Sequence, residues 1–534
     1  MKRLGITILT LLTSILLSDS LFAQKTVLIV PVEINSTQFT CGQTKMEALL
    51  AQAEDYYSLL DGKYPCKFTL APTVRLTSAR YTSETAAMAA LEAYRACARQ
   101  LDLEDYEDDF GIIFSGADIW PHEGVLRGTG INYFATSETF QEMTLPLGVF
   151  CHEYAHLLGL KDLYDTDGEK SGGESIGLWG SLSLMDKGGS GLTPCALNAI
   201  DRHLLGLTPA DTLTTGHYDL EPVTENGRYF LLPTDRTGEY FLLETRVQEG
   251  LDANIGGSGL LIYHIDRSTN KAGYSTYYDK ILTAQQRWEY NEVNCRVDHQ
   301  CALLLEAYPG TEDVSGVFFP YREGQSITNE STPALRSWSG AGNKYTIRNI
   351  TRNSDGSVGF DIIEPLREDM VNVYQTAALL CWTLDSSLTD GYTSCEVQIQ
   401  SDGREDLIYD GTMDQDGQIS VYLTDLESNT SYSAELLVHL KDEDYSISTS
   451  FKTLVTDERN DIPFIYISRE SGRTIPLYVF NSQDATQIRW TFEGAEITPD
   501  AKGCYTLPGS GTLRAELVWE DGTSDVICKE ITGR

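Results

Sequence analysis

The stretch HEYAHLLGLKD, residues 152–162, decides how the chain around it must fold. On a helix, His152 and His156 lie four positions apart and therefore on the same face, about one turn from each other. This spacing lets both imidazoles reach one metal ion, and Glu153 beside them is placed to handle a proton rather than to bind the metal. The stretch therefore predicts a helix that carries a metal site and a general base.

The third metal ligand has two candidates beyond the helix. Gly159 can end the helix in a left-handed conformation and turn the chain back. Asp162 then returns toward the ion, whereas Asp165 follows three residues later, and motif position favours Asp162. Zinc suits such a set, because three protein ligands leave one position for a water whose pKa the ion lowers. Glu153 would take the proton of that water and pass it to a leaving amine.

An acidic, glycine-rich segment follows at residues 165–180. Asp165, Asp167, Glu169 and Glu174 supply carboxylates of the kind that binds calcium, although the start of the segment departs from the EF-hand pattern. A calcium site through Asp165 and Asp167 and a solvated loop both fit this composition, and the solvated loop is the favoured interpretation.

The charge balance argues against a protein that binds nucleic acid or anionic membranes. The 534 residues include 40 basic and 78 acidic ones, which gives a formal net charge of -38. Such a field repels nucleic acid and anionic membranes and keeps a protein soluble. The length indicates several domains, since one domain usually takes ~100–200 residues.

The first 23 residues have the pattern of a signal peptide. Lys2 and Arg3 precede an apolar run from Leu4 to Leu17, which is shorter than the ~20 residues that a membrane span needs. Cleavage is expected near Ala23, and no later stretch is apolar enough to span a bilayer. We therefore expect a secreted or periplasmic bacterial protein without a transmembrane anchor.

Strands and helices alternate between the expected signal peptide and residue 214, which indicates an α/β fold. Strands are predicted at 26–34, 66–76, 110–114 and 130–135, and helices at 43–60, 84–101, 145–158 and 194–206. Pro146 is expected at the first position of the metal helix, and Pro194 and Gly206 are expected to begin and end the last helix.

The rest of the chain is predicted to be mostly strand. A β-rich part spans 215–364, and two all-β sandwich modules follow at 365–456 and 457–534. In the first module Leu426 precedes Tyr432 by six residues, which resembles the tyrosine corner of a fibronectin type III sandwich. The second module resembles a small immunoglobulin-like domain through its strand pattern and Trp490.

Several segments together resemble the immune inhibitor A family of secreted bacterial zinc metallopeptidases, a metzincin-like group in which an Asp replaces the usual third His. The resemblance covers about residues 26–364 and is carried by HEYAHLLGLKDLYD at 152–165, AEDYYSLLDGKY at 53–64, IWPH at 119–122, GLWGSLSLMDKG at 177–188, GEYFLLETR at 238–246 and GLLIYHID at 259–266. It implies a metzincin-like α/β domain, protein substrates and a Met-turn residue, Met185, packed beneath the metal. It also implies that Gly188–Pro194 line the pocket beyond the scissile bond.

Two departures from the family pattern stand out. Five residues separate Trp179 from Met185, where the family usually has Trp-Asp-Leu-Met. Only the expected signal peptide precedes the first predicted strand, so the propeptide that many members carry is not visible.

The remaining candidate residues have mainly structural interpretations. Among eleven cysteines, Cys295 with Cys301 and Cys504 with Cys528 are candidate disulfides, and Cys151 is a candidate buried free thiol. His122 and His264 lie in family-like segments, but a lone histidine near a strand is more often structural.

Together these features predict a secreted zinc-dependent endopeptidase with His152, His156 and Asp162 as ligands and Glu153 as general base. One alternative is an inactive adhesion protein that contacts a surface or glycan through its β-sandwich modules. Another is a zinc hydrolase that acts on a different bond, such as an amide of a cell-wall peptide. The intact Glu153 argues against the inactive alternative.

Overall fold

The structure is a computed structural model that describes residues 25–531 apart from short gaps. The gaps are 60–63, 65, 78–84, 100–108, 127, 190, 192, 374, 402–406, 415, 424–425, 456–463, 467–473, 481, 483–484, 501–503 and 521. The expected signal peptide lies outside the described residues, as do parts of the Gly188–Pro194 segment. No helix among the described residues is long and apolar enough to cross a membrane.

The chain divides into two compact units. One contains the residues up to Asn343 together with Ile347–Ile362, and the other contains Lys344–Thr346 and Ile363–Arg534. Each unit has hydrophobic clusters of its own, so each is described by itself.

The first unit begins with a mostly parallel sheet in the order β2-β1-β4-β6-β5, with β3 also pairing β1. Its strands are β1 (Lys25–Ile34), β2 (Cys66–Leu70), β3 (Val74–Leu76), β4 (Asp109–Phe114), β5 (His122–Val125) and β6 (Asn132–Ser137). Only β5 runs antiparallel to its neighbour among the described strands of this sheet, and it lies at the edge next to β6.

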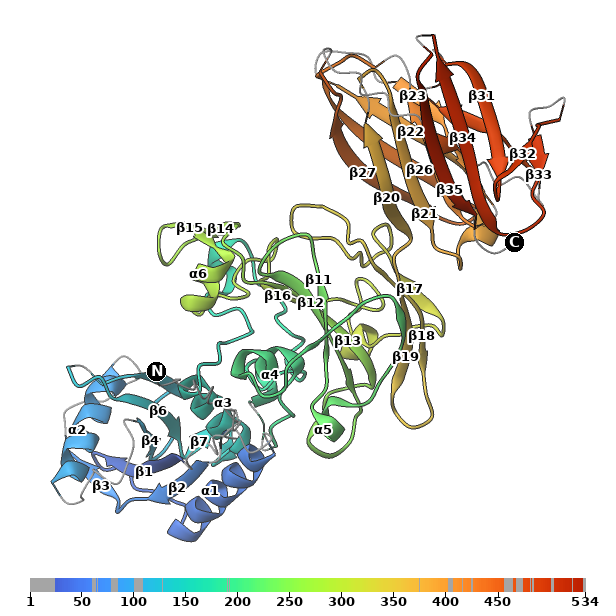
Figure 1. Cartoon of the computed structure of the whole chain (residues 1–534). Coiled ribbons are helices and arrows are strands. Elements are labelled where there is room, and N and C mark those ends of the chain that lie inside the picture. The colour runs from blue at the N-terminus through green and yellow to red at the C-terminus, as the bar shows by residue number, and fades with distance from the viewer. Residues whose placement is uncertain are drawn as a thin grey trace, which may run out of the picture. The chain divides into compact units, whose positions relative to one another are not determined.

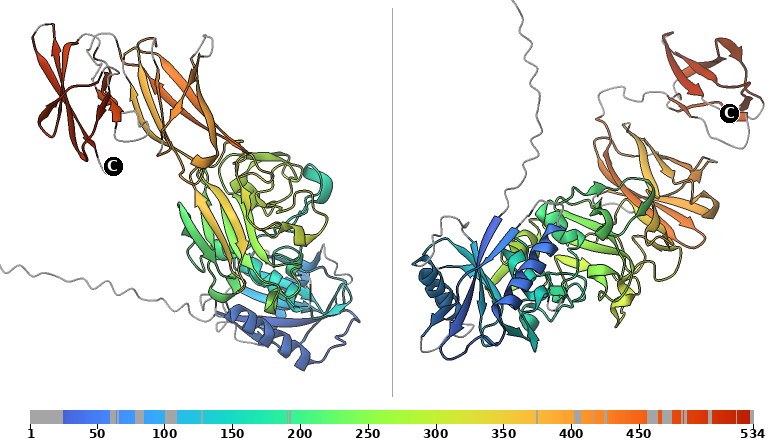
Figure 2. Two further views of the ribbon diagram at one scale, coloured as in Figure 1. Left: turned by 90° about the vertical axis from the view of Figure 1, so that its right-hand side faces the viewer. Right: turned by 90° about the horizontal axis from the view of Figure 1, so that it is seen from below.

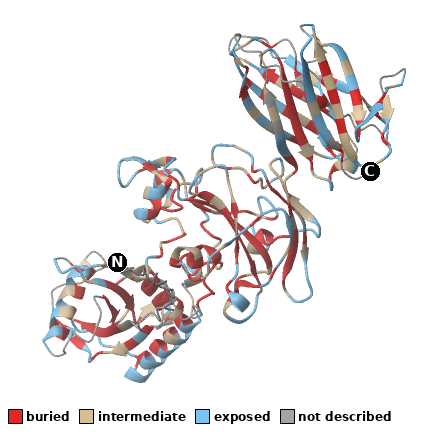
Figure 3. Ribbon diagram, in the orientation of Figure 1, coloured by how far each residue is buried: buried red, intermediate tan, exposed pale blue. Residues whose placement is uncertain are grey.

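Both faces of this sheet are covered by helices. Because side chains alternate along a strand, Val27 and Ile29 of β1 face the cluster that includes α1 (Gln43–Ser58), whereas Val30 and Val32 face α2 (Ala86–Ala98). Figures 1 and 2 show α1 and α2 on opposite faces of the sheet. The buried colour of the central strands in Figure 3 fits strands covered on both sides, as a parallel sheet requires. The predicted α/β arrangement of this part of the chain is thus observed.

The metal helix, α3 (Leu147–Leu157), follows the short hairpin of β7 (Thr139–Phe140) and β8 (Met143–Thr144). It packs into the same cluster as α1 through Phe150 and Tyr154, whose rings meet Phe68 of β2 edge to face. Pro146 precedes the helix as its N-cap and is not its first helical residue, which corrects the prediction by one position.

The next helix starts later than predicted. It is α4 (Ala199–Leu205), capped by Asn198, whose side chain accepts a hydrogen bond from the Asp201 backbone N–H. Gly206 ends it with a φ of 61°, as the sequence suggested. Pro194 does not begin a helix: α4 starts only at Ala199, after its cap Asn198, and the Ala196 backbone N–H donates to the buried Asp252 carboxylate at 3.0 Å.

The β-rich part of the first unit holds two antiparallel-rich sheets. One has the order β16-β13-β12-β11-β9 and the other β10-β19-β18-β17. Their strands are β9 (Asp211–Thr212), β10 (Gly216–Leu220), β11 (Phe230–Pro233), β12 (Glu239–Arg246), β13 (Gly259–Asp266), β16 (Ala302–Leu304), β17 (Gln325–Ile327), β18 (Thr346–Arg352) and β19 (Val358–Ile363). The short helix α5 (Val223–Asn226), the hairpin β14 (Lys271–Ser275) with β15 (Lys280–Thr283), and α6 (Ala284–Glu289) complete this part.

The second unit consists of strands apart from one short 3-10 turn at Thr389–Gly391, where it is described. Its first eight strands form two four-stranded sheets, β20-β21-β25-β24 and β23-β22-β26-β27, around one core that contains Trp382. Their bounds are β20 (Leu366–Val373), β21 (Ala378–Leu384), β22 (Tyr392–Gln400), β23 (Leu407–Asp410), β24 (Thr412–Met413), β25 (Gln418–Leu423), β26 (Ser431–Leu440) and β27 (Asp444–Lys452). The Tyr432 hydroxyl accepts a hydrogen bond of 2.8 Å from the Glu427 backbone N–H, the contact that a tyrosine corner makes.

The last eight strands gather around a separate core that contains Trp490. Four of them form the sheet β32-β31-β34-β35, and the others form two-stranded pairs. Their bounds are β28 (Phe464–Tyr466), β29 (Thr474–Pro476), β30 (Tyr478–Phe480), β31 (Ala485–Phe492), β32 (Ala495–Ile497), β33 (Cys504–Thr506), β34 (Gly511–Trp519) and β35 (Ser524–Ile531).

The described cysteines form no disulfide. The two candidate disulfides, Cys295–Cys301 and Cys504–Cys528, are therefore wrong, and Cys295 instead contacts the Thr166 hydroxyl at 3.2 Å. Cys151 is buried and free, as predicted, and burial raises the pKa of its thiol.

Candidate metal centre

The structure brings His152, His156 and Asp162 together at one point. Their ligand atoms lie within 4.8 Å of one another. The Asp162 Oδ1 atom is 3.1 Å from His152 Nε2 and 3.4 Å from His156 Nε2. The two rings meet edge to face with centroids 4.9 Å apart, as expected for neighbours one turn apart on α3.

The other nitrogen of each imidazole contacts a backbone carbonyl. His152 Nδ1 lies 2.7 Å from the Leu184 oxygen, and His156 Nδ1 lies 3.0 Å from the Leu160 oxygen. A carbonyl only accepts, so each Nδ1 carries a proton, and Nε2 is the ring nitrogen that faces the common point. This is the tautomer that metal-binding histidines adopt.

Asp162 is held by Asn291 from the β-rich part of the same unit. The Asn291 amide donates to Asp162 Oδ2 at 2.6 Å and its oxygen accepts from the Asp162 backbone N–H at 2.8 Å. Oδ1 is buried and makes no hydrogen bond to another described residue, so it is free to face the two Nε2 atoms. Burial acts to raise the pKa of Asp162, but the two histidines outweigh it and hold this pKa well below its usual range.

The turn after α3 gives Asp162 its position. Gly159 has a φ of 102°, and its N–H donates to the His156 carbonyl at 2.9 Å while Leu160 N–H donates to Ala155 at 3.2 Å. These bonds close the helix and reverse the chain within three residues. A side chain at Gly159 would have open space around it, so the backbone angle and not crowding selects glycine here.

Glu153 is buried at 6% exposure and lines a cleft of about 260 Å³ next to His152. Burial raises its pKa to about 7, while His152 and His156 act to lower it and Asp162 and Glu123 add to the rise. A carboxylate with this pKa gains and loses a proton readily near neutral pH.

Aromatic side chains form the walls of this cleft. Trp120 is 61% exposed and meets Phe140 edge to face at 4.9 Å, and both line the cleft. Tyr164 stacks near His152 with ring centroids 6.4 Å apart. Burial, together with Asp162 and Glu153, raises the pKa of Tyr164.

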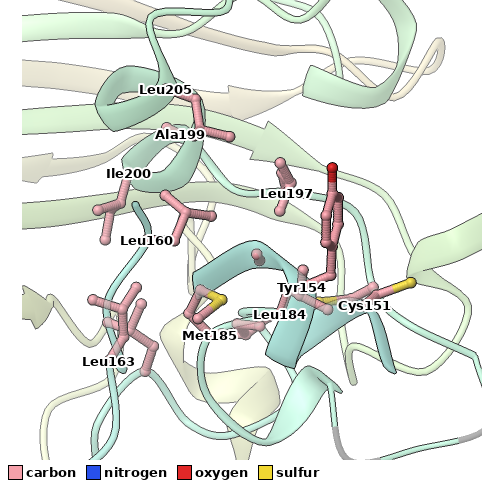
Figure 4. Packing of buried hydrophobic residues seen from close by; sticks show 14 of the residues in the cluster. Cys151, Tyr154, Leu160, Leu163, Leu184, Met185, Leu197, Ala199, Ile200 and Leu205 are labelled. Carbon is pink, nitrogen blue, oxygen red and sulfur yellow. The ribbon is translucent and has the colours of Figure 1, made fainter. Parts of the chain in front are cut away.

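Met185 is fully buried in the cluster that contains α3. Figure 4 shows it beside Leu184 at the helix that carries Cys151 and Tyr154. Its carbonyl accepts from Leu163 N–H at 2.7 Å, so the segment of Met185 is tied directly to the residue after Asp162.

The acidic segment folds on itself near the metal centre. Asp165, Asp167 and Cys295 bring ligand atoms within 4.8 Å of one another. The Asp165 carboxylate, however, accepts three backbone N–H groups, from Asp167, Gly168 and Ser175, at 3.0, 2.9 and 3.0 Å. Asp165 therefore orders the loop, and it is not grouped with the two histidines.

His122 and His264 have protein partners of their own. His122 contacts the Trp120 carbonyl at 2.8 Å and the Tyr133 hydroxyl at 3.1 Å, and burial lowers its pKa. His264 pairs with Glu239 at 2.8 Å. Both have the structural role that the sequence favoured.

Two residues at the site were not predicted. Tyr164 lies two positions after Asp162, so its place in the motif was a usable signal. Asn291 is 129 residues away from Asp162, and nothing in its local sequence marks it.

The donor set fits a zinc ion. Two neutral imidazole nitrogens and one carboxylate oxygen are ligands that zinc prefers in catalytic sites with an open position. The free Oδ1 atom of Asp162 and the Nδ1–carbonyl contacts leave all three donor atoms available to one ion.

Residues 121–203 match the family model of the immune inhibitor A peptidase M6 catalytic domain. A search of curated proteins found no match. Among solved structures, a two-domain fibronectin type III segment from chicken tenascin is 14% identical, covers 31% of this chain and 99% of its own, and has a TM-score of 0.15. A redesigned β-sandwich protein is 20% identical, covers 17% of this chain and 97% of its own, and has a TM-score of 0.14.

The family match includes both histidines, Glu153, Asp162 and Met185. This match indicates a metallopeptidase. A peptidase of this family uses a catalytic metal and acts on proteins. The resemblance stated from the sequence is therefore confirmed at residues 121–203, where the chain is similar to the catalytic domain of the immune inhibitor A peptidases.

Proposed function

We propose that this protein is a secreted zinc-dependent endopeptidase with His152, His156 and Asp162 as metal ligands and Glu153 as general base. The convergence of His152 Nε2, His156 Nε2 and Asp162 Oδ1 beside a buried Glu153 is the observation that carries the proposal. When bound, zinc acts as a Lewis acid on a carbonyl and lowers the pKa of water.

The chain's own residues supply positioning and proton transfer. Glu153 accepts a proton from the attacking water and delivers it to the leaving amine, tasks that suit its pKa of about 7. Asn291 holds the Asp162 carboxylate, and the carbonyls of Leu184 and Leu160 hold the imidazoles. Met185 packs below α3 and gives the ligands a rigid base.

The lining of the cleft supports the proposal that it binds peptide substrates. Its exposed Trp120 and the neighbouring Phe140 offer apolar area to a side chain, while Lys187 and Gln141 offer polar contacts along the same rim. Concave sites that combine apolar walls with a few polar groups are typical of ligand binding.

The experiment combines metal content with casein hydrolysis for the wild type and Glu153→Ala. We expect about one zinc per chain in both proteins and a loss of hydrolysis of at least about 100-fold in the variant. Glu47→Ala, which removes an exposed carboxylate from α1, is the matched control and should keep full activity.

Two results would contradict the proposal. A wild type that binds zinc but cleaves proteins and varied peptides no better than Glu153→Ala would point to the inactive adhesion protein or to a hydrolase of another bond. A preparation that binds no zinc would exclude both the zinc endopeptidase and a zinc hydrolase of another bond.

Export and the domain plan form the second part of the proposal. Residues 1–23 are proposed as a cleaved signal peptide, residues 24–364 as the peptidase domain, and residues 365–456 and 457–534 as fibronectin type III-like and immunoglobulin-like modules. The Glu427–Tyr432 hydrogen bond supports the first module. Mass spectrometry of the exported protein should find its first residue at Gln24, and an uncleaved Met1 would contradict export by this signal.

A further inference from the structure

A second pocket in the same unit lies at the turn that follows the metal helix. It has a volume of about 550 Å³ and opens between the turn after α3, helix α4, strand β12, the end of β13 and helix α6. Its lining includes Lys161, His203, Tyr240, Arg267, Trp288 and Glu289, which we call the basic pocket. It shares no lining residue with the cleft at Glu153.

Lys161 and Arg267 of the basic pocket have no carboxylate partner in the part of the chain that the structure describes. None of the ion pairs found among the described residues includes Lys161 or Arg267. Glu289 is the carboxylate in the lining, and it accepts a hydrogen bond from Gln285 at 2.9 Å. The chain has 78 acidic and 40 basic residues, yet these two cations beside one cavity have no ion-pair partner among the described residues.

His203 faces the same space. Its Nδ1 lies 3.3 Å from the Tyr229 hydroxyl. Burial lowers the pKa of His203, and the positive charge of Arg267 adds to this effect. Three basic side chains from different elements thus surround one cavity.

The remaining walls are aromatic and firmly held. Trp288 is buried, and its indole N–H donates to the Asp266 carbonyl at 2.8 Å. The Arg267 guanidinium lies 5.7 Å from the Trp288 ring centre, which fixes the cation by a cation–π contact. Tyr240 packs against His203 with ring centroids 5.4 Å apart. A preformed cavity with apolar walls and a few convergent charges is the usual form of a small-molecule site.

We propose that the basic pocket binds a small organic anion, a carboxylate attached to an aromatic or apolar body. Lys161 and Arg267 would pair with the carboxylate, and Trp288 and Tyr240 would contact the apolar body. Because Lys161 is next to Asp162, a ligand in the pocket would also contact the segment that positions this metal ligand. Both a free aromatic acid and the C-terminus of a peptide with an apolar last residue have this chemistry.

Calorimetric titration of the full-length protein tests the proposal with defined probes. Benzoate represents a free aromatic acid, and N-acetylphenylalanine represents a peptide C-terminus. N-acetylphenylalanine amide tests the apolar body without the carboxylate, and inorganic sulfate tests the negative charge without the apolar body. We expect at least one carboxylate probe to bind at least about 10-fold more tightly than the amide and sulfate. The titrations are repeated on chelator-treated protein, so that a carboxylate bound to the catalytic metal is not mistaken for this site.

Variants locate the binding. Arg267→Gln and Lys161→Gln should each weaken the preferred probe by at least about 10-fold. Arg228→Gln is the matched control, because Arg228 also lies 5.7 Å from an aromatic ring, that of Phe230, but outside the pocket. It should leave the affinity unchanged.

Several outcomes would overturn the proposal. The first is that neither carboxylate probe binds to the wild type. The second is that the amide binds as tightly as the carboxylate, and the third is that both pocket variants bind the preferred probe with the affinity of the wild type. Thermal unfolding confirms that each variant is folded, and the comparison of carboxylate with amide in the wild type needs no variant. The result is independent of peptidase activity, so it can fail while the proposed function stands.

Discussion

Asn291 shows how one side chain far along the sequence organises the metal centre. It makes two hydrogen bonds to Asp162, one to the carboxylate and one to the backbone. Both bonds fix the carboxylate so that Oδ1 points toward the histidines. Residues that orient a metal ligand in this way typically contribute 10–100-fold to metal affinity or activity, on the order of 1–3 kcal/mol.

Asn291→Ala is therefore expected to weaken zinc binding by about 10–100-fold with little change in secondary structure. Competition with a chromophoric zinc chelator measures this affinity. Asn226→Ala, which removes an exposed amide far from the site in sequence, is the control and should bind zinc like the wild type. Equal affinities for the wild type and Asn291→Ala would show that Asp162 does not depend on this amide.

Asp201 is a second residue with an unusual environment. Both of its carboxylate oxygens are buried and lack a hydrogen-bond partner among the described residues. Burial raises its pKa to about 8, and Glu244 adds to the rise while His152, Arg246 and Arg202 oppose it. A folded-state pKa above the unfolded value means that the protonated carboxyl is favoured in the fold. This stabilisation is complete below the unfolded pKa and is lost as the pH rises through the folded pKa.

Asp201→Asn should remove this pH dependence. Between about pH 5 and pH 8 the wild type is expected to lose at least about 1.4 kcal/mol of unfolding free energy relative to the variant, the equivalent of one pKa unit. Urea unfolding of chelator-treated protein at the two pH values measures the difference. A difference between the two proteins that stays constant with pH would contradict the raised pKa.

At the scale of elements, the turn at Gly159 links the metal helix to its third ligand. Its φ of 102° is costly for any residue with a Cβ. Gly159→Ala is expected to destabilise the unit by about 1–2 kcal/mol and to weaken zinc binding, because relaxation of the turn moves Asp162.

Urea unfolding and zinc competition measure the two effects of Gly159→Ala. Gly42→Ala serves as control, because Gly42 has an ordinary φ of -84° and open space around it. The control should keep the zinc affinity of the wild type. An unchanged affinity in Gly159→Ala as well would mean that the turn does not set the position of Asp162.

A buried ionic cluster ties the β-rich part to the segment of Met185. Arg246 pairs with Asp252 at 2.5 Å and Glu244 at 3.2 Å, with all three side chains 0% exposed. Arg246 also donates to the carbonyls of Leu182 and Ala196, each at 3.3 Å. The cluster therefore holds the chain on both sides of Met185.

Arg246→Met is expected to cost about 3–5 kcal/mol of unfolding free energy, because it leaves two buried carboxylates without their cation. Arg228→Met removes a partly exposed arginine that pairs with Asp211 at 2.9 Å, and it should cost less than about 1 kcal/mol. Chemical denaturation compares the two. Similar small losses in both variants would show that the cluster adds little to stability.

At the scale of the whole molecule, the chain consists of two units with separate cores. The clusters around α3 and β1 belong to the first, and those around Trp382 and Trp490 belong to the second. Units with cores of their own are expected to fold independently.

A chain shortened after Glu364 is therefore expected to fold, to bind zinc and to retain casein hydrolysis within about 3-fold of the full-length protein. Circular dichroism, zinc analysis and the casein assay test these points. A shortened chain that is unfolded or cannot bind zinc would show that the second unit is needed for the metal centre.

The sequence by itself determined the local features of this protein. The four-residue spacing of His152 and His156 predicted a helix at 145–158, and α3 spans Leu147–Leu157. The β-branched run at 26–34 predicted the buried strand β1, and Gly206 was correctly placed at the end of α4. These features depend on periodicity and backbone angles, which neighbouring residues set.

Only the tertiary structure decided the contacts between distant segments. Asn291 reaches Asp162 across 129 positions, and the backbone N–H groups of Ala196 and Ala199 bond to Asp252 and Glu244 in the β-rich part. The basic pocket likewise depends on elements that fold together from distant parts of the chain. Buried polar groups must find partners wherever the fold places them, so such pairings follow from packing and not from local sequence.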